Sequence, residues 1–125
     1  MKIKDVEVFE KMQAQLHGLY DEMVVFSKKK PDDPVNKFKL KFINQVLINT
    51  NAILDEKNKP FHDFDAFDED SLPTNSDVVM ILSQYINCLE KFRSENITTE
   101  YGEWYWIING KKSDIETAPP KKLVY

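Results

Sequence analysis

Apolar residues recur along the first part of the chain at alternating spacings of three and four positions. The series is Phe9, Met12, Leu16, Leu19, Met23 and Phe26. This spacing places all six side chains on one face of an α-helix. We expect a helix over residues 4–29, with Glu7 and Lys11 forming an i,i+4 ion pair on its outer face. Pro31 then ends the helix.

A second and a third helix follow from the same kind of pattern. Asp33 can cap a helix that has Pro34 in its first turn, and a wide apolar face extends this helix over residues 34–57. Thr74 and Asp77 have the spacing of a capping box, which predicts a third helix over residues 75–95. The expected fold is mainly α, an antiparallel three-helix bundle.

The C-terminal part of the chain differs in kind. Over residues 104–108, Trp104, Trp106 and Ile108 alternate with Tyr105 and Ile107, as on the two faces of a strand, and the pair Asn109–Gly110 is a strong signal for a two-residue hairpin turn. We expect a small C-terminal β-hairpin over residues 103–117 and an extended tail over residues 118–125. A strict two-residue turn would place Glu103 opposite Glu116, which leaves a shifted register open.

Composition limits the class of protein. A chain of 125 residues with 42% apolar and 30% charged residues fits a single globular domain over residues 1–125. One cysteine, Cys88, excludes an internal disulfide and fits a reducing compartment. No run is apolar enough to span a bilayer or to form a signal peptide, so we expect a cytoplasmic protein with no membrane partner.

Charge is unevenly distributed along the sequence. Residues 28–59 contain eight lysines and four acids, whereas residues 60–77 contain six acids and neither lysine nor arginine. Segregated charge of this kind suits a protein partner. The alternative is that the lysines at 28–30 only complement the negative end of the first helix dipole.

The acidic stretch "PFHDFDAFDED", residues 60–70, looks at first like a cation-binding loop. Counted from Asp63, it lacks the ligands and the glycine that an EF-hand requires, so we expect no metal. Its phenylalanines at 61, 64 and 67 recur every third residue, which predicts a short acidic helical connector whose apolar edge packs on the helices.

Catalytic motifs are not evident in the sequence. Cys88 lies on the apolar face of the third helix, so an inert core thiol is favoured over a pair with His17 or His62. The three glycines are isolated and form no phosphate-binding loop, and we expect neither an enzyme nor a cofactor. Gly18 lies in mid-helix, which indicates a close helix approach or a slight kink.

The preferred hypothesis is a non-catalytic protein-interaction module, acting as an adaptor, inhibitor or accessory subunit. The expected partner-binding residues lie in the connector and the hairpin and are Phe64, Asp65, Phe67, Asp68, Tyr101, Trp104, Tyr105 and Trp106. One alternative is that the hairpin aromatics only close the end of the bundle. Another is a nucleic-acid-binding accessory subunit in which lysines of the second helix and the tail contact phosphates and tryptophans stack on bases. Self-association is left open.

Overall fold

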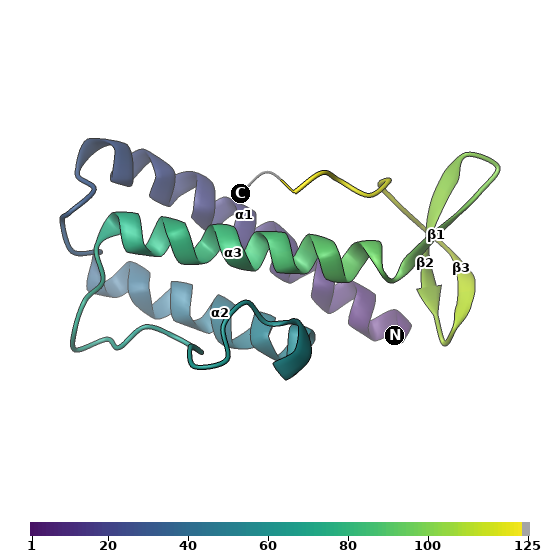
Figure 1. Ribbon diagram of the computed structural model, residues 1–125, viewed down its shortest axis with the longest axis horizontal. Coiled ribbons are helices and arrows are strands. Elements are labelled where there is room, and N and C mark those ends of the chain that lie inside the picture. The colour runs from purple at the N-terminus through teal and green to yellow at the C-terminus, as the bar shows by residue number, and fades with distance from the viewer. Residues whose placement is uncertain (124–125) are drawn as a thin grey trace.

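Three helices lie alongside one another and a small sheet extends from one end of them in the computed structural model, which describes residues 1–123 (Figure 1). The helices are α1 (Ile3–Lys29), α2 (Lys37–Asn58) and α3 (Asn75–Ser94). The strands are β1 (Ile97–Glu100), β2 (Glu103–Ile108) and β3 (Lys111–Thr117). The mainly helical class with a small antiparallel β-element is confirmed. No described helix is long and apolar enough to cross a membrane.

The stripe of α1 and the apolar face of α3 form the centre of the core. On α1 the buried members of the stripe are Phe9, Met12, Leu16 and Met23. On α3 the buried apolar residues are Val78, Ile81, Leu82, Tyr85, Ile86 and Leu89. Thr74 caps α3 as predicted: its hydroxyl accepts a hydrogen bond from Asp77 N at 3.2 Å, and the Asp77 carboxylate accepts from Thr74 N at 3.4 Å. The last member of the α1 stripe, Phe26, is 40% exposed.

The direction of α3 differs from the expected alternation, in which each helix would run against the one before it. α2 and α3 begin at the same end of the molecule, because Val35 N donates to Pro73 O at 2.9 Å and Asn75 N donates to Asp33 O at 3.0 Å. They therefore run in the same direction, and only α1 runs against both (Figure 1). Because residues 33–35 pair with residues 73–75, α2 begins later in the sequence than predicted, and its N-cap is Asn36 instead of Asp33.

The connector between α2 and α3 is not helical, so the helical turn predicted there is wrong. Residues 59–73 form turns and bends that run back along the length of α2 (Figure 1). The Asn44 side chain, 4% exposed, holds this path by donating to Phe67 O and accepting from Phe67 N, both at 2.9 Å. The backbone groups of Phe67 are thus satisfied by a side chain of α2 and not by a helical turn, and a second amide of α2, Asn51, donates to Asp65 O at 2.9 Å.

The predicted hairpin is present, and a strand that was not predicted joins its other side. The sheet order is β1–β2–β3, all antiparallel, and Asn109 and Gly110 both have positive φ in the β2–β3 turn, as a type I′ turn requires. A bulge shifts the register so that Glu116 pairs with Tyr105 and not with Glu103. Ser113 supports the bulge, since its hydroxyl donates to Trp106 O at 2.7 Å.

A buried arginine ties the segment after β3 to α3. Arg93, the only arginine in the sequence, is 2% exposed and forms two hydrogen bonds to the Glu90 carboxylate, at 2.9 and 2.8 Å. Its remaining donors bind Thr117 Oγ1, Ala118 O and Pro119 O at 2.7–2.9 Å. All five guanidinium N–H groups are thus used. The predicted extended tail is irregular over residues 118–123, and its last two residues lie outside the described range.

Candidate functional site: the groove between α1 and α2

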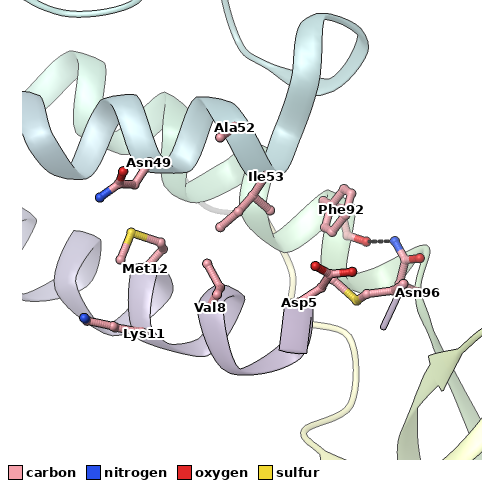
Figure 2. A pocket seen from close by; sticks show the side chains of 10 residues that line it. Asp5, Val8, Lys11, Met12, Asn49, Ala52, Ile53, Phe92 and Asn96 are labelled. Atoms are coloured by element: carbon pink, nitrogen blue, oxygen red, sulfur yellow. Dashed lines mark hydrogen bonds between the residues drawn. The ribbon is translucent and has the colours of Figure 1, made fainter. Parts of the chain in front are cut away.

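A groove open to solvent follows the line between α1 and α2. It consists of two adjoining hollows of about 670 and about 460 Å³ that share Lys11, Met12 and Asn49. Figure 2 shows the first hollow, where Val8 and Met12 of α1 face Asn49, Ala52 and Ile53 of α2. Phe92 of α3 and Asn96 also line this hollow (Figure 2).

Thirteen residues of the two helices line the groove, seven from α1 and six from α2, and we call this set the α1–α2 groove. From α1 they are Asp5, Val8, Lys11, Met12, Gln15, Gly18 and Leu19. From α2 they are Phe42, Gln45, Val46, Asn49, Ala52 and Ile53. The α1 positions 8, 12, 15 and 19 and the α2 positions 42, 45, 49 and 52 each follow a three-four spacing, so each helix presents a straight seam to the groove.

Charge is sparse in the α1–α2 groove. Asp5 and Lys11 are the two charged residues among the thirteen, a smaller share than the 30% of charged residues in the chain. Seven of the thirteen are apolar, and Val8 and Phe42 are 43% and 42% exposed. A surface seam that is poor in charge and exposes apolar side chains has the composition found at the centre of protein–protein interfaces.

Lys11 itself has no ionic partner. Within residues 1–123 its ammonium group makes neither an ion pair nor a hydrogen bond, so the expected pair with Glu7 does not form. The neighbouring acid, Asp5, is already engaged, since its carboxylate accepts a hydrogen bond from Lys2 N at 2.8 Å. Lys11 therefore offers a positive charge that is free to meet a carboxylate from outside.

At Gly18 no side chain covers the backbone of α1 where this helix lines the groove. A Cβ built at this position would have no heavy atom within 4 Å, so of the two expectations for Gly18 the close helix approach does not occur among residues 1–123. A glycine in a helix interior costs about 1 kcal/mol relative to alanine. No contact within the described chain offsets that cost.

A charged bridge closes one end of the groove. Lys39 of α2 donates to Glu22 of α1 at 2.6 Å, and its ammonium lies 3.8 Å from the centroid of the Phe26 ring. Beside this bridge Phe38, 71% exposed, packs edge-to-face on Phe42 with ring centroids 5.0 Å apart. The open length of the groove therefore runs from Asp5 to Leu19 on α1, which is about 21 Å or four helical turns.

The four aromatic residues predicted as partner contacts in the sheet occupy different environments. Tyr101 is 97% exposed at the β1–β2 turn, where it has a φ of +52°. Tyr105 is half-buried, with the Lys112 ammonium 4.2 Å from its ring centroid. Trp104 packs partly buried against the core, and Trp106 has no exposed surface. Trp106 is thus a core residue in contact with Phe9, and we withdraw it as a partner or base-stacking contact.

The four connector residues predicted as partner contacts are divided between core and solvent. Phe64 and Phe67 are partly buried and pack on each other, with ring centroids 5.1 Å apart. Asp65 and Asp68 are exposed, but Asp65 accepts a hydrogen bond from the Lys59 ammonium, and this bond raises the pKa of Lys59 above its ordinary value of 10.5. The Asp68 carboxylate accepts from Asp70 N at 2.9 Å within a local turn.

The structure brings together no catalytic group at the positions considered from the sequence. Within residues 1–123, Cys88 has no histidine in contact, and burial raises the pKa of its thiol above the ordinary value of 9.0, with Lys91 offsetting part of the rise. No three histidine, cysteine, aspartate or glutamate side chains of the described residues lie close enough together to hold a metal ion. The thiol–imidazole pair and the cation loop that were weighed and disfavoured from the sequence gain no supporting geometry from the described residues.

Sequence reasoning did not find the α1–α2 groove. The available signal was a second three-four series on the first helix, at positions 5, 8, 12, 15 and 19, beside the stripe that was recognised. Its polar members, such as Gln15, made it resemble a solvated face. The relative position of the first two helices was also needed, and the sequence pattern does not contain it.

Comparisons with protein-family models, with curated proteins and with solved structures found no match for the chain. The function proposed below therefore depends on the geometry of the described residues.

Proposed function

We propose that the chain is a small, non-catalytic protein-interaction module of the cytoplasm, built on a three-helix bundle, and that it receives its partner in the α1–α2 groove. One observation carries the proposal: the thirteen groove residues include only two charged ones, Asp5 and Lys11, and expose apolar side chains over about four helical turns. An interface centre excludes charge because desolvating an unpaired charge is costly.

The exposed turn at Tyr101 is a second contact within the same proposal. A bulky residue with positive φ is strained by about 1–3 kcal/mol, and strain of this size is concentrated at functional positions. Tyr101 lies between Glu100 and Glu103, which pair across the turn. An exposed aromatic side chain flanked by two acidic residues therefore projects from the sheet. The acids of the connector, Asp65 and Asp68, add to the acidic surface available for a basic partner.

Site-specific photo-crosslinking tests the proposal. A photoreactive phenylalanine analogue replaces Gln45 in the groove or, as the matched control, Ala14 on the exposed face of α1 outside it. We expect a discrete protein adduct in the source cells from position 45 and not from position 14. The partner is then identified by mass spectrometry and purified.

Calorimetric titration of the purified partner completes the test. The wild-type chain should bind it, Asn49→Lys should bind at least tenfold more weakly, and Ala14→Lys should match the wild type. Both substitutions place a lysine at an exposed helical position, so a general effect of charge or stability would appear in both. Equal adducts from positions 14 and 45, or unchanged affinity of Asn49→Lys, would refute the groove as the partner site.

A further inference from the structure

The α1–α2 groove has the shape of a binding site for one more helix. Its two walls are helices that run in opposite directions, and each presents a three-four seam to the opening. An amphipathic helix with apolar residues at the same spacing would insert its ridge between these seams, as in other helix-in-groove complexes. An extended peptide would place alternate side chains into solvent and could not follow a 3.6-residue repeat.

Lys11 specifies the charge of such an occupant. It is the one cation of the groove, it is exposed, and no described residue pairs with it, whereas the groove's acid, Asp5, accepts a hydrogen bond from Lys2 N. When the groove is covered, an unpaired ammonium would lose hydration without compensation, whereas a carboxylate opposite it would restore the interaction. The occupant should therefore carry an acidic residue opposite Lys11.

Gly18 specifies where the occupant comes closest. It lies seven residues after Lys11, which is two helical turns or about 10.5 Å along α1. The missing side chain lets a partner backbone or a large side chain approach α1 at this level, as small residues do at helix crossings. Resting on the function proposed above, we infer that the groove binds a four-turn amphipathic helix of another protein whose carboxylate faces Lys11 and whose point of closest contact lies two turns away, at Gly18.

A second copy of this chain fits less well. A symmetric pair would bring two identical hollows face to face and leave space between them, whereas a single ridge fills one hollow. It would also bring a second Lys11 into the interface, while Asp5, the neighbouring acid of the groove, already caps the start of α1. A heterologous helix meets the free charge directly.

Selection from a displayed library of 16-residue helices tests the inference without knowledge of the natural partner. The library keeps apolar residues at three-four spacing and randomises the flanking positions between Glu, Lys and Gln. It is selected in parallel on the wild type and on Lys11→Glu. We expect the wild type to enrich peptides with an acidic residue at one defined flanking position, and Lys11→Glu to enrich lysine at that same position.

Peptides from the wild-type selection are then measured by fluorescence polarisation. Affinity should fall at least tenfold on Lys11→Glu and on Gly18→Leu, and should stay within twofold on Ala14→Glu and Ala14→Leu. A peptide with its acidic residue changed to lysine should recover affinity on Lys11→Glu. This reciprocal exchange excludes a loss of folding as the explanation.

The outcomes separate this inference from the proposed function. Some peptides could lose binding to Asn49→Lys but bind Lys11→Glu as tightly as the wild type. That result would refute the acidic helix as the occupant and leave the groove as the partner site. The inference itself would be overturned if the library yielded no binder, or if its binders had the same affinity for the wild type, Lys11→Glu and Asn49→Lys. The crosslinking experiment decides the proposed function independently. A wild-type dimer in sedimentation equilibrium that Asn49→Lys dissociates and Ala14→Lys does not would replace the occupant by a second copy.

Discussion

Replacing Gly18 with alanine should stabilise the folded protein. Gly18 lies inside α1, fifteen residues after its first residue and eleven before its last, so neither helix end relieves the cost of a glycine. The new Cβ meets no atom within 4 Å, so it neither clashes nor gains packing. The full difference in helix propensity should therefore appear, about 1 kcal/mol in the free energy of unfolding.

Urea denaturation followed by circular dichroism measures this change. With a denaturant slope of about 2 kcal/mol/M, the midpoint should rise by about 0.5 M while the slope stays the same. For 125 residues at about 2.1 cal/mol/K each, the unfolding entropy is about 260 cal/mol/K, so Tm should rise by about 4 °C.

The reverse substitution on the same helix supplies the control. Ala14 is exposed on α1 outside the groove, so Ala14→Gly should lower the free energy of unfolding by a similar amount, about 1 kcal/mol. If Ala14→Gly destabilises and Gly18→Ala is neutral or harmful, then Gly18 has a contact or a backbone conformation that the structure lacks. That result would remove the argument that Gly18 is kept bare for an external partner.

Three further predictions concern the rest of the molecule. Arg93→Ala should cost about 3 kcal/mol or more of unfolding free energy in urea denaturation, because it leaves the Glu90 carboxylate buried without its partner; a cost below about 1 kcal/mol would contradict the buried pair. Burial raises the pKa of Tyr85 above its ordinary value of 10.0, so the folded state keeps the phenol proton at a higher pH than the unfolded state does. The free energy of unfolding should therefore fall as pH rises above about 10. Unfolding curves measured at pH 8 to 11 should show a smaller decline for Tyr85→Phe. Asn44→Ala should accelerate hydrogen exchange at the Phe67 amide and cost about 2 kcal/mol, whereas unchanged exchange would show that the connector does not need this clamp.

The sequence predicted those parts of the fold that local chemistry decides. The ends of α1 and α3 lay within two residues of expectation, because three-four spacing, prolines and the Thr74 capping box act over only a few residues. The Asn109–Gly110 turn was predicted correctly for the same reason, since both residues accept positive φ. Each of these signals is complete within one segment of the chain.

Features that depend on two distant segments were missed or mistaken. The shared starting point of α2 and α3 depends on backbone bonds such as Val35 N to Pro73 O, which no local pattern encodes. The connector adopts turns because Asn44, more than twenty residues earlier, holds Phe67, and this overrides the three-residue period of its phenylalanines. β1 is only four residues long, Ile97–Glu100, and gains its stability by pairing with β2.

The composition of the groove explains why it can be exposed to solvent without promoting aggregation. Three of its thirteen residues are the amides Gln15, Gln45 and Asn49, which water can hydrate when the groove is empty and a partner helix can hydrogen-bond when it is filled. A groove of the same size lined only by apolar residues would favour aggregation. Amides also bury at lower cost than charges, because they carry no net charge to desolvate. The seam between α1 and α2 therefore suits a surface that is covered for part of the time, and Lys11 supplies the charge that selects which helix covers it.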